Sequence, residues 1–308
     1  MIERLLSGPI VAEPCDGVAQ WWPRHRELGV SGNDQFGHAI AGGLAADRVG
    51  WAFASGYQAA LHALFPDAPD DLICALCVTE AEGNSPRAIK SSLRKDGNGW
   101  LLSGAKRWTT LGPEGSIFFV AARDEAASGE RAAIKIVTVM SDSAGLKIEV
   151  MPETKFVPEV PHARLQFENL KIPQTAILSG DGYAIYVKPF RTVEDIYVNS
   201  AILAYLAREA RRLAWPRDWL ERCIATLVSL QGLGARSPAS PATHIALAGT
   251  LAVVAELASR ADELWERTST DAAAVRWKRD RALFGVAAAA RLARTERAWQ
   301  ELAPGIRP

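Results

Sequence analysis

The chain has 308 residues, 48% of them apolar and 23% charged, which is enough material for the buried cores of two or three domains in an ordinary globular protein. Its 35 acidic and 35 basic residues balance, which excludes a strong overall field for nucleic acid or an anionic membrane. The N-terminus lacks the apolar run of a signal peptide and no run approaches the length that spans a bilayer, so we expect a cytoplasmic protein with neither nucleic acid nor membrane as a partner.

Cysteine and histidine spacing predicts no metal site. Cys74 and Cys77 have the C-x-x-C spacing of a redox pair or of half a zinc site, but no second Cys/His pair follows at zinc-ligand spacing. The segment Leu72–Val78 is apolar, so we interpret both cysteines as core residues. The five histidines form no H-x-x-H or H-E-x-x-H motif. We therefore expect no metal cofactor.

The first predicted element is a helix over Asp34–Phe65. This stretch contains no proline, and apolar residues recur at three- and four-residue steps from Val49 to Leu61. Pro66 and the acidic run Asp67–Asp71 then end the pattern and supply a turn. We assign residues 1–71 to a short N-terminal helical domain.

From Leu72 to Leu178 the sequence changes to short β-rich runs separated by polar, glycine or proline breaks. The runs lie at Ile89–Leu93, Trp100–Ser103, Ile117–Ala121, Ala133–Met140, Leu146–Met151 and Ala163–Phe167. Between two of them, the sequence DGNG at residues 96–99 tolerates the positive φ that a tight hairpin requires. We expect a compact, barrel-like β-domain at residues 72–178.

Helical periodicity returns after Gly180-Asp181-Gly182. We expect four helices, at residues 184–213, 217–233, 243–267 and 271–302. The third has an apolar stripe with alternating steps of four and three, typical of the inward face of a bundle: Leu247, Leu251, Val254, Ala258 and Ala261. Residues 179–308 are therefore assigned to a C-terminal four-helix bundle, and the whole chain to the α+β class.

Three segments of the β-rich region follow one another in a specific order. Residues 78–85 are VTEAEGNS, residues 96–104 are DGNGWLLSG, and residues 104–110 are GAKRWTT. In this order they resemble the T-E-P-x-A-G-S-D, D-G-x-x-[WY]-x-[LI]-x-G and G-x-K-x-[WF]-I-[TS]-N elements of the acyl-CoA dehydrogenase family. Residues 165–173 (LQFENLKIP) and 180–183 (GDGY) resemble that family's next strand and helix entry. The resemblance covers residues 72–213 and implies the fold order helical domain, β-domain, helical bundle.

The resemblance implies a site for FAD. An isoalloxazine ring needs an aromatic neighbour and hydrogen-bond donors near N5 and the pyrimidine edge, because negative charge accumulates there when hydride arrives. By resemblance, Trp108 would flank the ring and Thr110 would hydrogen-bond near N5. Val78 and Thr79 would contact the pyrimidine side, and Ser85 would reach the pyrophosphate. Taken singly, each has a structural interpretation as well, as a core aromatic or an ordinary strand residue.

The loop that carries Ser85 departs from the family pattern. Ala81, Asn84 and Pro86 stand where the family has proline, glycine and aspartate, and Leu111 replaces an asparagine. Because Pro86 fixes its own φ and biases Ser85 towards an extended conformation, we expect a loop of different shape.

The catalytic base departs further. In most of the family a glutamate follows a Q-x-x-G-G-x-G-Y segment, which this sequence does not contain, and the R-x-x-F-G element that contacts the neighbouring subunit's FAD is not visible either. A minority of the family places the glutamate on the first bundle helix. Counting from Gly182 puts Val193 at that position and Glu194 one residue later, about 100° around a helix. Glu194 is the candidate base, with a solvated helix carboxylate as the alternative.

Three functions are consistent with these residues. The first, which we favour, is an acyl-CoA dehydrogenase-like oxidoreductase that uses FAD, acts on an acyl-CoA or related thioester, and passes electrons to an electron-transfer flavoprotein. The second is a flavin-dependent monooxygenase or oxidase of the same superfamily, which needs no base for the α-proton. The third is a non-catalytic subunit of a hetero-oligomer. The family usually associates through its C-terminal helices, so the resemblance implies a homo-oligomer unless a second chain completes the site.

Overall fold

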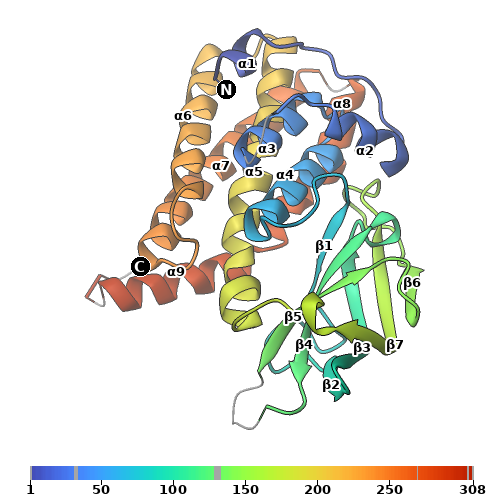
Figure 1. Ribbon diagram of the computed structural model, residues 1–308. Coiled ribbons are helices and arrows are strands. Elements are labelled where there is room, and N and C mark those ends of the chain that lie inside the picture. The colour runs from blue at the N-terminus through green and yellow to red at the C-terminus, as the bar shows by residue number, and fades with distance from the viewer. Residues whose placement is uncertain (1, 31–33, 128–132, 269, 304, 307–308) are drawn as a thin grey trace. The chain divides into compact units, whose positions relative to one another are not determined.

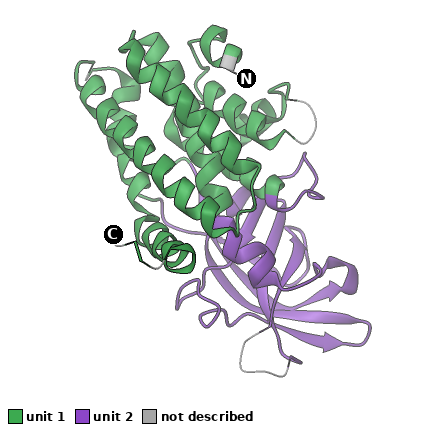
Figure 2. Ribbon diagram, turned by 90° about the vertical axis from the view of Figure 1, so that its left-hand side faces the viewer, with its two compact units in different colours: residues 1–63, 154–159, 192–308 green, residues 64–153, 160–191 purple. Residues whose placement is uncertain are grey.

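The structure, a computed structural model, describes residues 2–30, 34–127, 133–268, 270–303 and 305–306. The chain forms two compact units (Figure 2). Unit 1 contains residues 1–63, 154–159 and 192–308, and unit 2 contains residues 64–153 and 160–191. The residues assigned from the sequence to an N-terminal helical domain and to a C-terminal bundle therefore share unit 1, and most of the predicted β-domain is unit 2.

The N-terminal part of unit 1 has two helices where the sequence predicted one. Its helices are α1 (Ile2–Ser7), α2 (Val18–Arg26), α3 (Gln35–Ala45) and α4 (Val49–Leu64) (Figure 1). The predicted helix over Asp34–Phe65 is interrupted after α3. There the guanidinium of Arg208, itself buried, donates to the main-chain carbonyls of Leu44, at 2.8 Å, and Ala46. These bonds satisfy carbonyls that a continuous helix would have paired internally.

The C-terminal part of unit 1 also has one break more than expected. Its helices are α5 (Lys188–Arg212), α6 (Arg217–Gly234), α7 (Pro241–Glu266), α8 (Ala272–Asp280) and α9 (Ala288–Leu302). The predicted fourth helix is divided by a 3-10 segment, Arg281–Gly285. The break follows Asp280, whose buried carboxylate accepts from the amide of Val157 at 2.7 Å. A contact with a distant part of the chain therefore holds the end of α8.

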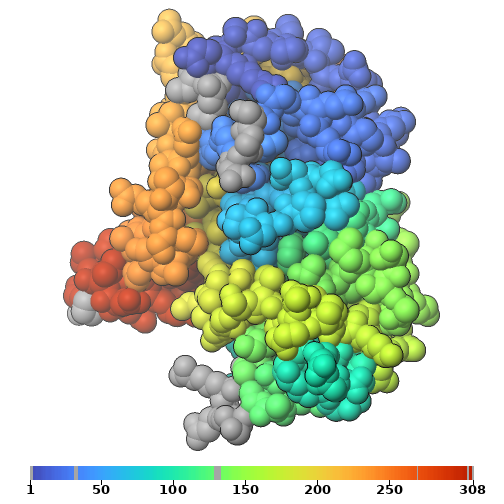
Figure 3. Space-filling view, viewed as in Figure 1, coloured from blue at the N-terminus to red at the C-terminus, as the bar shows by residue number. Residues whose placement is uncertain are grey.

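Glycines bring α3 and α4 close to α5 in the interior of unit 1. A Cβ on Gly43 would lie 2.0 Å from the carbonyl oxygen of Ala201, and one on Gly56 would lie 2.6 Å from the Cα of Val198. These positions need glycine because backbone occupies the space of a side chain. The N-terminal helices and α5 therefore pack as one core, and α6, orange in Figure 3, lies on the surface of unit 1.

The longest helix, α7, corrects one expectation. By length and composition it can span a membrane, so the statement that no run approaches that length was wrong. Only 28% of its most apolar window is buried in unit 1. The buried positions include the predicted Leu247, Val254, Ala258 and Ala261, with Leu251 half-buried. A core helix of a non-membrane protein passes the same test, so the absence of a membrane partner stays a prediction.

Unit 2 is built on a seven-stranded sheet that matches the predicted strands. They are β1 (Cys74–Cys77), β2 (Ser92–Asp96), β3 (Gly99–Thr110), β4 (Ile117–Asp124), β5 (Ile134–Met140), β6 (Leu146–Val150) and β7 (His162–Pro173). Their order is β1-β4-β2-β3-β7-β6, with β5 paired to β4. The predicted hairpin is confirmed, since Asp96 pairs with Gly99 and Gly97 has a φ of 57°. The curled sheet confirms the expected β-domain, whose strand β3 carries much of the candidate site.

The core of the sheet contains the C-x-x-C pair. Cys74 and Cys77 are both buried in β1, which confirms their interpretation as core residues. Burial raises the pKa of each thiol to about 12, so both remain protonated at neutral pH.

Candidate functional site

A buried ion pair connects the first and third motifs within unit 2. Lys106 Nζ lies 2.6 Å from Glu80 Oε1 and also donates to the carbonyl of Val78 at 3.4 Å. The Glu80 carboxylate accepts further from the amides of Lys90 and Ser91, at 2.8 and 3.1 Å. Burial alone would raise the pKa of Glu80, but the charge of Lys106 and these hydrogen bonds hold that pKa below its ordinary value. The pair thus fixes the end of β1 against β3.

Trp108 lies on β3 in an unusual backbone conformation. Its φ is 57°, and the register between β3 and β7 shifts between Lys106 and Thr109, so Trp108 sits in a β-bulge. Its side chain is 47% exposed. The indole meets the ring of His162 edge-on at 5.9 Å. A large aromatic residue held in the left-handed region with its face accessible is a feature typical of a binding site.

Three more of the predicted residues lie beside this bulge. The amide of Arg107 donates to the carbonyl of Thr79 at 2.8 Å, which places Val78 and Thr79 next to β3. Thr110 follows two residues after Trp108 and pairs with His162 of β7. The side-chain hydroxyls of Thr79 and Thr110 have no hydrogen-bond partner among the described residues, and both side chains are half-buried. They are available to a ligand edge.

Ser85 lies further along the loop from this group. The loop turns tightly because Glu80 and Gly83 exchange main-chain hydrogen bonds of 2.8 and 3.1 Å, with a φ of 117° at Gly83. Ser85 is exposed, and its hydroxyl accepts from the amide of Ala88 at 3.3 Å. It still has its own proton to donate. Ser85 lines a hollow of about 940 Å³ whose cationic residues are Arg87, Arg123 and Lys188.

These residues fit a flavin in unit 2. An exposed indole offers a flat neighbour, and the unpaired hydroxyls of Thr79 and Thr110 offer donors near it. The cations around Ser85 suit a pyrophosphate, although Asp124 and Asp181 line the same hollow and offset part of that charge.

Sequence reasoning missed a second hollow on the other side of the same loop. It measures about 570 Å³ and is lined by Glu82, Ser91, Arg107 and Arg164. The buried hydroxyl of Ser91 has no hydrogen-bond partner among the described residues. Gly104 allows this close packing, because a Cβ there would lie 2.6 Å from the Cα of Ser91. The only sequence signal for this hollow was Gly104 itself, the first residue of the third motif.

The candidate base lies in unit 1. Glu194 is half-buried on α5. Its neighbour Asp195 is 1% exposed and binds two arginines of α9, with Arg291 Nη2 at 2.7 Å and Arg294 Nη2 at 2.9 Å. Sequence reasoning missed Asp195, because nothing in the local pattern indicates that α9 supplies two cations to it.

Comparison with known proteins identifies the β-domain. Residues 75–170 match the family model described as acyl-CoA dehydrogenase, middle domain. The mitochondrial short/branched chain specific acyl-CoA dehydrogenase of Rattus norvegicus is 30% identical over 112 residues, which cover 35% of this chain and 26% of the relative. The chain belongs to the acyl-CoA dehydrogenase family. The match spans about a quarter of the length of the curated relatives, and lies in the region where the motifs were found.

Solved structures extend the likeness to both units of this acyl-CoA dehydrogenase family member. Butyryl-CoA dehydrogenase from Megasphaera elsdenii is 13% identical, with a TM-score of 0.72 over 94% of this chain and 90% of that chain. PigA, solved with FAD and proline, is 14% identical, with a TM-score of 0.71 over 93% of this chain and 90% of that chain. At these identities the likeness concerns the fold, and it confirms the predicted fold class.

Proposed function

We propose that this chain is a flavin-dependent oxidoreductase that removes two hydrogens from the α and β carbons of an acyl-CoA or related thioester. The observation that carries the proposal is the exposed indole of Trp108 at the bulge of β3, beside the half-buried Thr79 and Thr110. When bound, FAD supplies a hydride acceptor at its N5 atom.

The chain's own residues would position the cofactor. Trp108 would cover one face of the flavin ring, and the hydroxyl of Thr110 would donate near N5. Val78 and Thr79 would contact the pyrimidine edge. Because the Glu80–Lys106 pair holds this part of the chain in place before any ligand arrives, the contacts would need little rearrangement. The hydroxyl of Ser85 would donate to the pyrophosphate.

Glu194 would take the α-proton of the acyl thioester as the β-hydrogen leaves with its electron pair. A general base must lie within hydrogen-bond reach of the proton that it accepts, in the complex with substrate. The half-buried position of Glu194 on α5 supports this role, because partial removal from water makes a carboxylate a better base.

The proposal extends to partners and location. We propose an electron-transfer flavoprotein as the electron acceptor, association into a homo-oligomer or with a second chain that completes the site, and a cytoplasmic location. The support is the likeness to the acyl-CoA dehydrogenases reported above.

One observation favours a second candidate, a flavin-dependent oxidase or monooxygenase. PigA shares this fold and is described with FAD and proline, which is not a thioester. In that case Glu194 would have no α-proton to remove, and reduced protein would be reoxidised rapidly by air.

The deciding experiment is the visible spectrum of the purified protein after dialysis against excess FAD. We expect oxidised-flavin bands at one flavin per chain, and bleaching on anaerobic addition of an acyl-CoA series. Bound flavin without bleaching, together with fast reaction of dithionite-reduced protein with oxygen, would favour the second candidate. Failure to retain flavin would refute both and leave the role of a subunit that needs a partner chain.

A further inference from the structure

Unit 1 contains an internal hollow that the functions above do not use. It has a volume of about 370 Å³ and is lined by α2, α3, α4 and the segment that precedes α2. The residues of its wall that matter here are Trp21, His25, Gly42, Trp51 and Ser55. Among the described residues, its lining includes neither the candidate base nor any residue predicted to contact FAD. We call it the N-terminal cavity.

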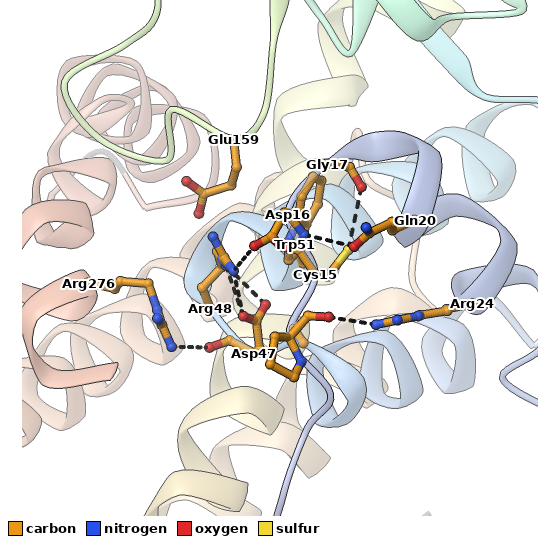
Figure 4. A network of polar contacts seen from close by, with 12 residues as sticks. Cys15, Asp16, Gly17, Gln20, Arg24, Asp47, Arg48, Trp51, Glu159 and Arg276 are labelled. Carbon is orange, nitrogen blue, oxygen red and sulfur yellow. Dashed lines mark hydrogen bonds and ion pairs between the residues drawn. The ribbon is translucent and has the colours of Figure 1, made fainter. Parts of the chain in front are cut away.

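The apolar wall of the N-terminal cavity is held in place by hydrogen bonding and stacking. The rings of Trp21 and Trp51 are nearly parallel, with centroids 5.5 Å apart. The indole nitrogen of Trp51 donates to the carbonyl of Cys15 at 2.8 Å, as the close-up shows (Figure 4). Both indoles are buried, at 5% and 1% exposure. The wall is therefore preformed, which lowers the entropy cost of accepting a ligand.

One polar pair interrupts this wall. His25 Nδ1 lies 3.2 Å from the hydroxyl of Ser55, and both side chains are buried. Gly42 leaves room for the pair, since a Cβ there would lie 2.3 Å from the Cβ of Ser55. After their mutual hydrogen bond, a hydroxyl and a neutral imidazole retain at least one donor and one acceptor between them. The pair can thus meet one hydroxyl, carbonyl or ring nitrogen of a ligand.

The charged groups around the N-terminal cavity are already engaged. Arg24 and Arg4 each donate to a main-chain carbonyl, at 2.8 and 2.9 Å. Asp47 binds Arg48 at 2.7 Å, in the network of Figure 4. Burial, together with the charges of His38 and His62, lowers the pKa of His25 to about 3, so its ring is neutral at pH 7. A charged ligand would lose hydration without gaining a free counter-charge.

From this geometry we infer that the N-terminal cavity is a binding site for an uncharged, mainly aromatic molecule of two fused rings that carries one hydrogen-bonding group. A cavity of about 150 Å³ lined by apolar side chains holds benzene, so the larger volume here has room for a second ring. The ring system would pack against Trp21 and Trp51, and its polar group would meet His25 and Ser55.

The test uses 2-naphthol as the probe and the full-length chain, with binding measured by isothermal titration calorimetry at pH 7. Ala45→Leu adds volume on the lining at an exposed position, and so carries little risk to folding. Ala19→Leu makes the same change on α2 at an exposed residue outside the lining. We expect one probe per chain, at least tenfold weaker binding to Ala45→Leu, and unchanged binding to Ala19→Leu.

Two further arms test the chemistry of the site. The double variant His25→Phe/Ser55→Ala removes both polar groups together, and we expect about fivefold to tenfold weaker binding of 2-naphthol, the effect of one hydrogen bond. The anion 2-naphthoate should bind the unaltered chain at least tenfold more weakly than 2-naphthol. Circular dichroism and thermal melting check that each variant is folded. No binding of 2-naphthol to the unaltered chain, equal binding to Ala45→Leu, or tighter binding of 2-naphthoate would each overturn the inference.

Discussion

Lys106 and Glu80 form an ion pair of 2.6 Å in the interior of unit 2, with the lysine 0% and the glutamate 8% exposed. The two residues belong to different sequence motifs, one after β1 and one on β3. The pair explains in physical terms why these motifs occur together, because either residue alone would be a buried charge without a partner. It also holds Trp108 and Thr79 in neighbouring positions, since both adjoin the paired residues in the chain.

Removing one member of this pair is predicted to destabilise unit 2. Lys106→Met leaves the Glu80 carboxylate buried without its cation, and we expect a loss of about 3–5 kcal/mol in the free energy of unfolding. Urea denaturation measures the loss, and hydrogen exchange in peptides of β1 and β3 assigns it to unit 2. The double variant Lys106→Met/Glu80→Leu should regain most of it, whereas Lys171→Met, on the exposed side of β7, should have no effect. A double variant as unstable as the single one would contradict the assignment.

The conformation of Trp108 leads to a prediction that separates stability from ligand binding. Trp108→Gly removes a side chain from a position with a φ of 57°, where glycine is favoured by about 1 kcal/mol, and this gain offsets the lost contact with His162. We expect unchanged thermal stability but at least tenfold weaker binding of FAD, measured by fluorescence titration. Trp108→Phe keeps an aromatic face and should bind FAD within about threefold of the unaltered chain. Equal FAD affinity in Trp108→Gly would remove the proposed role of the indole.

Much of the fold follows from local patterns in the sequence. Alternating β-rich runs and the DGNG turn predicted the strands from β2 to β7, because side-chain alternation and turn chemistry depend only on neighbouring residues. The two helix breaks did not follow, since both depend on residues distant in the chain. Arg208 satisfies the carbonyls at the end of α3, and Val157 occupies the carboxylate of Asp280 at the end of α8.

The candidate site was predictable in identity but not in geometry. The motifs named Trp108, Thr110, Val78, Thr79 and Ser85, and the structure brings the first four together. The positive φ of Trp108 arises from a register shift against β7, which no spacing within β3 indicates. The helix count that selected Glu194 gave no sign of the arginines that bind its neighbour.

The buried His25 predicts a pH dependence of stability. Its folded pKa of about 3 lies below the ordinary value of 6.5, so the unfolded chain binds more protons than the folded chain between these two pH values. The contribution to stability is therefore complete above pH 6.5 and is lost as the pH falls towards 3. From pH 7 to pH 5 we expect a loss of about 2 kcal/mol from this residue.

Comparing the unaltered chain with His25→Phe isolates that contribution. The variant has no titrating group at this position, so its unfolding free energy should depend less on pH by the same amount. Urea denaturation at pH 5, 6 and 7 measures both slopes. Parallel slopes would mean that His25 takes up its proton in the folded state as easily as in the unfolded one.

The adjacent carboxylates of α5 are predicted to have different roles. Glu194→Gln should leave the fold and FAD binding intact but slow the anaerobic bleaching of bound flavin by an acyl-CoA by about 10²- to 10⁴-fold, because it removes the base. Asp195→Asn removes a buried charge that binds Arg291 and Arg294, so we expect a loss of about 3–5 kcal/mol in stability and detachment of α9. Rapid mixing measures the first effect, and hydrogen exchange in α9 measures the second.

The pattern across the two variants is what distinguishes a base from a structural carboxylate. A structural role for Glu194 would make Glu194→Gln lower stability and flavin retention together, as in Asp195→Asn, and would leave no specific effect on bleaching. Glu221→Gln, an exposed change on α6, supplies the background for a lost surface charge. If bleaching by an acyl-CoA persists at the unaltered rate in Glu194→Gln while stability is unchanged, the α-proton is taken by another group, and a partner chain becomes the place to look for it.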